Sequence, residues 1–243
     1  MQIKVLSANS VFRDQLLAEH GLALWIEYQG KKYLFDTGQG YVLKHNADVL
    51  NIDFNNLDGV ILSHNHYDHT GGLLNIMEIN STVKVFGHPD TIKNNKEENI
   101  NFQSVIKKTE ISPGLWMTGQ LPLDILNISK NNKYMDQIKT ENSLYMQTEK
   151  GLVVLLGCSH SGVINILKYI KKTTKKNIYA VIGGMHLINK QERELNKIIS
   201  ELKKLKIDSF YPLHCTGYNA TLKMKEIFND RVSILNVWDK VEF

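Results

Sequence analysis

Six of the nine histidines lie in four short segments, and each segment directly follows an apolar run typical of a β-strand. The segments are SHNHYDHTGG with His64, His66 and His69, GCSHSG with His160, GGMHL with His186, and PLHCTG with His214. In layered α/β folds, ligands and catalytic groups gather at the carboxyl ends of strands. The sequence therefore predicts a fold in which these strand ends converge.

Strand-like and helical segments alternate through most of the chain, and the order is similar in its two halves. Predicted strands cover 3–6, 22–28, 32–35, 59–62, 83–86, 144–147, 152–156, 178–182 and 209–212, with a last strand from Val232. Predicted helices lie near 41–50, from 70 or 71, and at 162–172, 191–206 and 219–228. This pattern predicts an α/β layered fold, a four-layer sandwich of helix, sheet, sheet and helix, as one domain over 1–243.

The stretch at about 89–141 breaks this alternation, because it is rich in Asn, Lys and Glu and holds three of the four prolines. It is expected to be an irregular insertion or lid between the two halves. Its aromatic residues Phe102, Trp116 and Tyr134 have two interpretations, a stacking surface for a flat substrate or ordinary packing of the insertion.

Composition excludes several classes of protein. The chain has 29 Lys and Arg against 25 Asp and Glu, a net charge of +4, which is too small to predict nucleic-acid binding. Two cysteines without a CxxC motif argue against a disulfide scaffold, and no apolar stretch approaches the length of a membrane span. We expect a cytoplasmic protein. A run of lysines near 168–176 is either the solvated end of a helix or a guide for an anionic substrate.

The spacing in SHNHYDH points to metal binding. His64 and His66 project to the same side of an extended segment, and the following turn brings Asp68 and His69 round from another side. Three imidazoles and a carboxylate so close together are costly to bury without a cation. For His20 and His45 we expect ordinary structural roles, and the same for His88, although it follows a strand-like run.

Small residues and glycines follow three of the histidines, as Thr70-Gly71-Gly72, Ser161-Gly162 and Thr216-Gly217. Each precedes a predicted helix. Helix N-termini favour anions through their free N–H groups and dipole. These places are therefore either anion sites or simply good capping sequences.

The motif SHNHYDHTGG resembles the HxHxDH signature of the metallo-β-lactamase superfamily, and FDTG and the later histidine segments extend the resemblance over nearly the whole chain. GCSHSGVINI, AVIGGMHL and YPLHCTG resemble the branch named after 7,8-dihydropterin-6-methyl-4-(β-D-ribofuranosyl)aminobenzene-5′-phosphate synthase. The resemblance implies a dinuclear metal site and orientation of its ligands by Asp36. It implies His64, His66 and His160 as ligands of a first metal, and Asp68, His69 and His214 as ligands of a second.

Two features depart from this family pattern. Many superfamily hydrolases have a metal-bridging aspartate where this chain has His186, so the second metal is weaker, absent or held differently, and His186 is a terminal ligand or a substrate contact. The segment TENSL at Glu141 lacks the paired aspartates expected in the branch. Cys158 and Cys215 lie next to His160 and His214, either as small buried residues or as thiolates near the metal.

We therefore expect an enzyme with one or two divalent metal ions per chain, zinc in preference to iron or manganese, acting on a small anionic and phosphorylated substrate. Asp68 and His186 are the expected catalytic residues. The reaction is hydrolysis by activated water, or a synthase-like transfer in which the metals stabilise a pyrophosphate leaving group. The alternative is an iron-containing redox or metal-binding protein of the same fold, although such flavodiiron proteins carry glutamate where His66 stands. An RNA-processing nuclease is disfavoured because no long arm for gripping RNA is evident.

Overall fold

The computed structural model describes residues 1–93, 99–122, 125 and 140–243. The chain divides into two compact units. The first unit contains residues 1–106 and 235–243, and the second contains residues 107–234. Each unit is built on one mixed sheet with helices packed on it, so the chain has the expected α/β fold.

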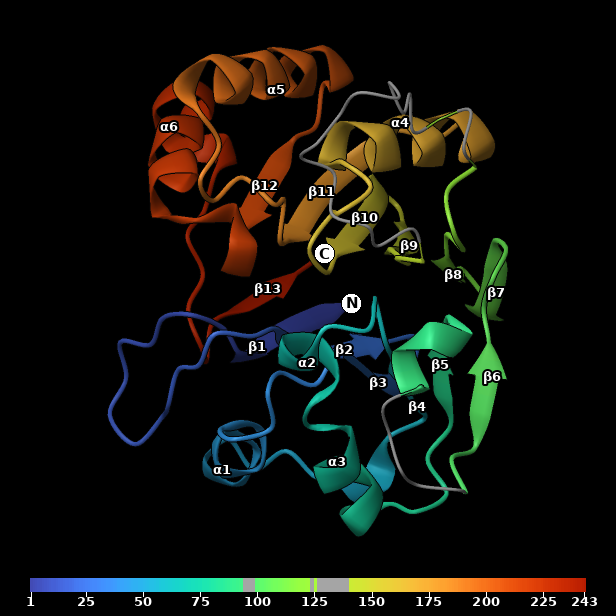
Figure 1. The fold of residues 1–243 in the computed structure, drawn as a ribbon. Coiled ribbons are helices and arrows are strands. Elements are labelled where there is room, and N and C mark those ends of the chain that lie inside the picture. The colour runs from blue at the N-terminus through green and yellow to red at the C-terminus, as the bar shows by residue number, and fades with distance from the viewer. Residues whose placement is uncertain (94–98, 123–124, 126–139) are drawn as a thin grey trace. The chain divides into compact units, whose positions relative to one another are not determined.

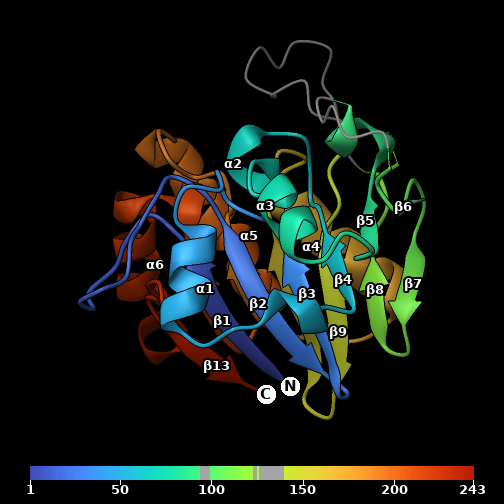
Figure 2. The same ribbon diagram turned by 90° about the horizontal axis from the view of Figure 1, so that it is seen from below.

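The first unit holds a seven-stranded sheet in the order β13-β1-β2-β3-β4-β5-β6 (Figure 2). Its strands are β1 Gln2–Ser7, β2 Ala23–Tyr28, β3 Lys31–Phe35, β4 Gly59–Ile61, β5 Val85–Gly87, β6 Phe102–Ser104 and β13 Lys240–Glu242. Its helices are α1 Leu43–Val49, η1 Phe54–Asn56, α2 Tyr67–Thr70, α3 Leu73–Ile79 and η2 Pro89–Ile92. β3, β4, β5 and β6 run parallel, so the loops after β3 and β4 both start at the carboxyl ends of these strands, on the same side of the sheet.

Local sequence explains the main features of this unit. The predicted strands 22–28 and 32–35 form a hairpin as β2 and β3, and its two turn residues Gln29 and Gly30 both have positive φ, which suits the twist of a two-residue hairpin. Apolar residues of α1 and α3, such as Leu43 and Ile76, pack with sheet residues such as Leu34 in one buried cluster. The helices therefore cover one face of this sheet.

The second unit holds a six-stranded sheet in the order β12-β11-β10-β9-β8-β7. Its strands are β7 Thr109–Ser112, β8 Leu115–Met117, β9 Leu144–Thr148, β10 Gly151–Leu156, β11 Ile178–Gly183 and β12 Ser209–Pro212. Its helices are α4 Val163–Thr174, α5 Glu192–Leu205, η3 His214–Thr216, α6 Tyr218–Phe228 and η4 Asn229–Arg231. β10, β11 and β12 are parallel, and α4 and α5 connect them in turn.

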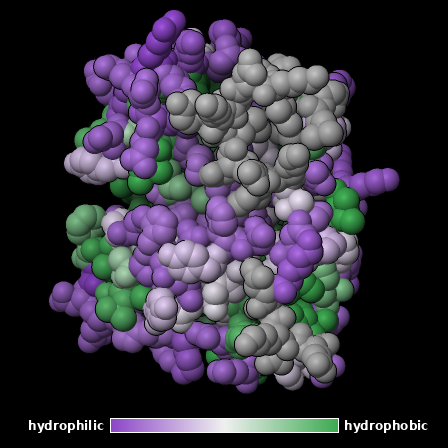
Figure 3. All heavy atoms as spheres, in the orientation of Figure 1, coloured by the Kyte–Doolittle hydropathy of each residue, from purple (hydrophilic) through white to green (hydrophobic). Residues whose placement is uncertain are grey.

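The helices α4, α5 and α6 lie along the same side of β10, β11 and β12 (Figure 1). In α4 the buried residues Val163, Ile166, Leu167 and Ile170 repeat with the helical period, which makes one apolar stripe against the sheet. The outer side of α5 is charged, and hydrophilic atoms dominate this part of the surface (Figure 3). None of the helices within the described residues is long and apolar enough to cross a membrane.

The prediction of a last strand from Val232 was wrong. Val232 forms an isolated bridge to Phe210 and no strand. Asn236 and Asp239 then form a turn in which the Asn236 N–H donates to the Asp239 carboxylate over 2.8 Å. The terminal strand β13 begins only after that turn. It pairs antiparallel with β1, which closes the edge of the first sheet.

Within the stretch at 89–141, the described residues supply β6 to the first sheet and β7 and β8 to the second. Phe102 packs against the core of the first unit, and Trp116 stacks on Tyr145 with the ring centroids 6.5 Å apart. These positions favour the core-packing interpretation of the two aromatic residues. Tyr134 lies outside the described residues.

The lysine run lies at the carboxyl end of α4, whereas the His160 segment precedes the amino end of the same helix. A helix of 12 residues separates the two ends by about 18 Å. Lys168 pairs with Glu201 of α5 at 2.7 Å, and Lys171 donates to the Leu205 carbonyl over 3.1 Å. The contacts favour a helix-end role over guidance of a substrate.

Candidate metal centre

The HxHxDH segment begins just after β4, as predicted. His64 and His69 are fully buried, and Asp68 is nearly so. His66 is the N-cap of the short helix α2, which carries Asp68 and His69 in its single turn. The structure thus brings His64, His66, Asp68 and His69 together within the first unit, with the His64 and His69 ring centroids 4.2 Å apart.

Asp36, the residue after β3, holds this cluster in place. Its fully buried carboxylate accepts from the Ser63 N–H and the Ser63 hydroxyl, each at 2.7 Å, and lies 2.7 Å from Nδ1 of His69. The Ser63 hydroxyl also lies 2.8 Å from Nδ1 of His64. The Nδ1 atoms of His64 and His69 therefore both have an oxygen partner, which fixes the ring orientations, as outer partners do for metal-ligating histidines.

The remaining ring nitrogens have the spacing of metal ligands. Nε2 of His64 lies 3.1 Å from Nδ1 of His66. Two nitrogens on one tetrahedral zinc ion, each about 2.05 Å from it, are about 3.3 Å apart. Nε2 of His69 lies 3.7 Å from Oδ2 of Asp68. The donor set and its buried, oriented imidazoles fit a divalent transition metal.

His20, expected to be structural, has a contact in this cluster. Its Nε2 atom lies 3.4 Å from Oδ2 of Asp68, and the side chain is 53% exposed. Nε2 of His45 lies 2.6 Å from the carbonyl oxygen of Gln15 in a loop. His88 caps η2 by accepting from the Asp90 N–H. The last two have the expected structural roles, whereas His20 sits beside a predicted catalytic residue.

In the second unit the three predicted histidines surround Cys158. Donor atoms of Cys158, His160 and His186 all lie within 4.8 Å of one another, and so do those of Cys158, His214 and Cys215. The His160 and His186 rings have centroids 4.6 Å apart. These residues come from the loops after β10, β11 and β12, so the parallel strand ends converge as predicted within this unit.

Both cysteines are buried, and neither forms a disulfide. Burial would raise the pKa of the Cys215 thiol, but hydrogen bonds from Cys158 and His186 and the nearby charge of His214 outweigh it and hold that pKa well below its usual range.

Glu141 organises the loop that carries His160, a role the sequence did not predict. The side chain is 1% exposed, and its carboxylate accepts from the backbone N–H groups of Ser159 at 2.6 Å and of Cys158 and Ser161 at 3.2 Å each. Burial raises the pKa of Glu141 to about 7, against the lowering effect of these N–H donors. Glu141 thus fixes the loop of His160 in the second unit, as Asp36 fixes Ser63 and His69 in the first.

Replacing Glu141 with Ala should lower the free energy of unfolding of the metal-free protein by about 3 kcal/mol, because three buried N–H groups would lose their acceptor. Urea denaturation measures this change. Glu149→Ala, at an exposed turn position, is the matched control and should change stability by less than about 0.5 kcal/mol. Equal effects of the two substitutions would contradict the role given to Glu141.

Four residues of these loops have positive φ although none is glycine. They are Asp36 at 58°, Ser159 at 66°, His186 at 53° and His214 at 48°. The left-handed region costs a non-glycine residue on the order of 1 kcal/mol, and such residues cluster at functional sites. The fold thus maintains strained backbone at the residues that carry the candidate chemistry.

Comparison with known proteins identifies the family of this chain. Residues 31–125 match the family model of the beta-lactamase superfamily domain. A 7,8-dihydropterin-6-methyl-4-(beta-D-ribofuranosyl)-aminobenzene-5′-phosphate synthase of Methanocaldococcus jannaschii is 30% identical over 272 residues, covering 96% of this chain and 92% of that protein. The chain belongs to the metallo-β-lactamase superfamily.

Solved structures of this superfamily share the fold. A metal-dependent hydrolase of the β-lactamase superfamily superposes with a TM-score of 0.86 at 29% identity, covering 100% of this chain and 99% of the other. The metallo-β-lactamase fold protein YhfI from Bacillus subtilis superposes with a TM-score of 0.68 at 14% identity, covering 99% of each chain. The chain is therefore a metallo-β-lactamase-fold protein of an enzyme family that includes hydrolases and a synthase.

The N-termini of two long helices follow histidine segments of this metallo-β-lactamase-fold chain, as predicted. α4 starts after Gly162 and α6 after Gly217, and no side chain caps either helix. Both glycines have positive φ, at 85° and 77°, so a residue with a side chain would be strained there. Uncapped N-termini leave backbone N–H groups for an anion.

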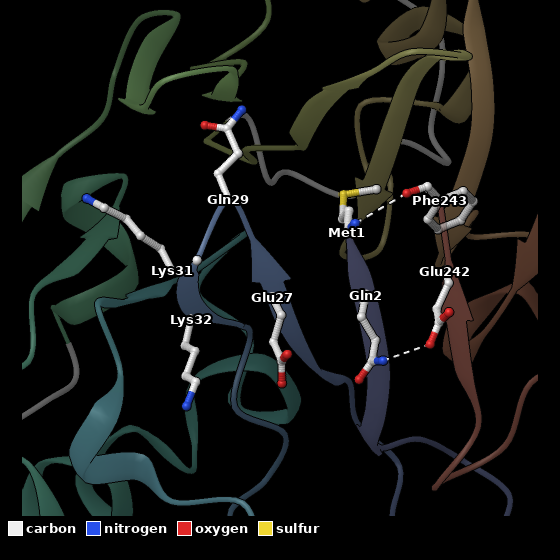
Figure 4. A pocket seen from close by; sticks show the side chains of 9 residues that line it. Met1, Gln2, Glu27, Gln29, Lys31, Lys32, Glu242 and Phe243 are labelled. Carbon is white, nitrogen blue, oxygen red and sulfur yellow. Dashed lines mark hydrogen bonds between the residues drawn. The ribbon is translucent and has the colours of Figure 1, made fainter.

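A shallow hollow in the first unit lies away from this chemistry (Figure 4). It lies between the β2–β3 turn and the two chain ends, where Gln2 donates to Glu242 over 2.9 Å. It is lined by the start of β1 and β3, whereas Asp36 and Ser63 follow the ends of β3 and β4. The hollow therefore lies at the opposite ends of these strands from the histidines of the HxHxDH segment.

Proposed function

We propose that this chain is a metal-dependent enzyme that acts on a small anionic, phosphorylated substrate by hydrolysis or by synthase-like displacement of an anionic leaving group. The observation that carries the proposal is the pair of ring nitrogens of the buried His64 and the half-buried His66, 3.1 Å apart, beside a His69 oriented by Asp36. One or two divalent ions fit this donor set, with zinc preferred. A cytoplasmic location stays a prediction from the cysteine usage.

The proposed ligands follow the superfamily pattern. The first metal would be held by His64, His66 and His160, and the second by Asp68, His69 and His214. His186 occupies the segment where many superfamily members have a bridging aspartate, and we propose it as a terminal ligand or a substrate contact. Its positive φ and its place beside His160 support a role in the site.

The divalent metal would supply Lewis acidity, which activates water and stabilises negative charge at a phosphoryl or carbonyl group. The protein's own groups perform the other tasks. Asp36 and Ser63 keep the His64 and His69 rings in one orientation, and Glu141 does the same for the loop of His160. Asp68 would hold the second metal and help orient the attacking group.

The preference for an anion rests on two observations. The uncapped N-termini of α4 and α6 directly follow the His160 and His214 segments. The M. jannaschii relative is named as a 5′-phosphate synthase, so a member of the family at 30% identity is associated with a phosphorylated molecule. Both support a phosphorylated substrate for this chain.

The proposal is tested on protein purified aerobically and anaerobically. Elemental analysis and the visible spectrum identify the metal and separate a zinc enzyme from the iron-containing alternative. A screen of phosphodiesters, thioesters, lactones and pterin pyrophosphates then identifies the reaction. We expect activity that a chelator removes and zinc or another divalent ion restores. Full activity after complete removal of metal would refute the proposal.

Inorganic phosphate or pyrophosphate should inhibit competitively at millimolar concentration, because each presents the anionic groups that the metals and helix N-termini would bind. The measurement is the apparent KM of the best substrate from the screen at increasing phosphate, with chloride at equal ionic strength as the control. A rate that ignores phosphate, or a faster rate on uncharged lactams, would contradict the predicted substrate class.

A further inference from the structure

We propose that Cys158, Cys215 and His214 form a binding site for a thiophilic metal ion, of the zinc and cadmium class, within the second unit. Their donor atoms, two sulfurs and one ring nitrogen, all lie within 4.8 Å of one another. On one tetrahedral zinc ion, two sulfurs are about 3.8 Å apart and a sulfur and a nitrogen about 3.5 Å. A side-chain shift of about 1 Å would therefore be enough to close the set on an ion.

The two cysteines meet because the ends of three neighbouring strands bring them together. Cys158 follows β10, Cys215 lies in η3 after β12, and β11 runs between these strands. Both residues are buried, at 3% and 5% exposure. The Cys215 thiol points at the loop of Cys158 and donates to its carbonyl over 3.4 Å.

A neighbouring glycine leaves space for the Cys215 thiol, and backbone hydrogen bonds hold the Cys215 residue in position. Gly184 follows β11, and a Cβ there would lie 2.6 Å from the Cys215 sulfur and 2.2 Å from the Gly157 carbonyl oxygen. The Cys215 carbonyl accepts from the N–H groups of both Leu187 and Ile188 at 3.1 Å. A site with a preformed space and fixed ligand backbones loses little conformational entropy when it binds an ion.

Two further donors lie near the sulfur of Cys158. Ring nitrogens of His160 and His186 also lie within 4.8 Å of the Cys158 sulfur. Soft thiolate ligands select zinc-like ions and exclude magnesium and calcium, which prefer oxygen. The site thus differs in chemistry from the His and Asp ligands proposed for the enzyme, while His214 is common to both. The inference rests on the second unit alone and goes beyond the proposed function.

Cadmium is the probe, because a thiolate bound to Cd²⁺ gives an ultraviolet charge-transfer absorption that imidazole and carboxylate ligands lack. The metal-free full-length chain, kept reduced with a phosphine, is titrated with Cd²⁺. We expect the absorption to appear at one equivalent, and to be at least halved in Cys158→Ser and in Cys215→Ser. His64→Ala with His66→Ala should keep it, which separates this site from the proposed enzyme ligands.

Cadmium-113 NMR of the unsubstituted protein gives a second measurement that needs no variant to fold. A resonance in the range of two-sulfur coordination is expected. The proposal is overturned if the unsubstituted protein gives no charge-transfer absorption, if both serine variants keep it in full, or if the resonance lies in the range of nitrogen and oxygen ligands only.

Discussion

Replacing His64 and His66 together with Ala should lower the affinity for zinc by more than about 100-fold. Loss of a single outer partner of a metal ligand already costs 10–100-fold in affinity, and here two ligands themselves are removed. Their nitrogens, 3.1 Å apart, have the spacing expected of two ligands on one ion. The measurement is competition with a chromophoric chelator, together with metal content after purification.

His45→Ala is the matched control, since His45 is exposed on α1 and contacts the Gln15 carbonyl. It removes an imidazole from the same unit and should leave zinc affinity unchanged. Metal stoichiometry and affinity that stay the same in the double variant would show that HxHxDH is not a metal-binding motif in this chain.

The second large effect is expected at Asp36. Asp36→Ala should lower the free energy of unfolding of the metal-free protein by about 3–5 kcal/mol, because it leaves the buried donors of Ser63 and the His69 ring without their acceptor. It should also weaken zinc binding about 10–100-fold, since His69 and, through Ser63, His64 lose their fixed orientation. Urea denaturation in chelator and zinc competition measure the two effects separately.

Two further variants serve as a conservative substitution and a control for Asp36→Ala. Asp36→Asn keeps the volume but points an N–H₂ group at a donor, so its losses should fall between those of Ala and the unsubstituted protein. Asp48→Ala removes an exposed carboxylate that pairs with Lys44 at 3.3 Å, and should change stability by less than about 1 kcal/mol. If Asp36→Ala resembled Asp48→Ala in both measurements, the orienting role of Asp36 would be wrong.

Most elements were predictable from sequence because their signals are local. The alternating apolar runs gave β1 to β5 and β9 to β12, and the helical period gave α4, α5 and α6. The terminal strand was missed because β13 has only three residues and owes its existence to its partner. It pairs with β1, whose register joins Gln2 to Glu242 at the other end of the chain.

The functional residues also divide into those that the sequence predicts and those that only the structure reveals. The HxHxDH spacing identifies a donor set within six residues. The strand-like runs before His160, His186 and His214 predicted convergence of these residues, and within the second unit they do converge around Cys158. The orienting role of Asp36 was implied by the family resemblance, and the structure supplies its partners. In the sequence, the TENSL segment at Glu141 stands out only because it lacks the paired aspartates expected in the branch, and nothing in it points to the loop that Glu141 holds.

The sequence by itself determined the layered α/β class, most of the elements, the superfamily and the histidine segments, since each depends on periodicity or spacing within a short stretch. Only the tertiary structure decided which buried groups satisfy one another. Asp36 meets His69 across 33 residues, and Cys215 meets Cys158 across 57. Such meetings depend on strand order and on how each loop closes, and both are set by packing of the whole sheet rather than by any local pattern.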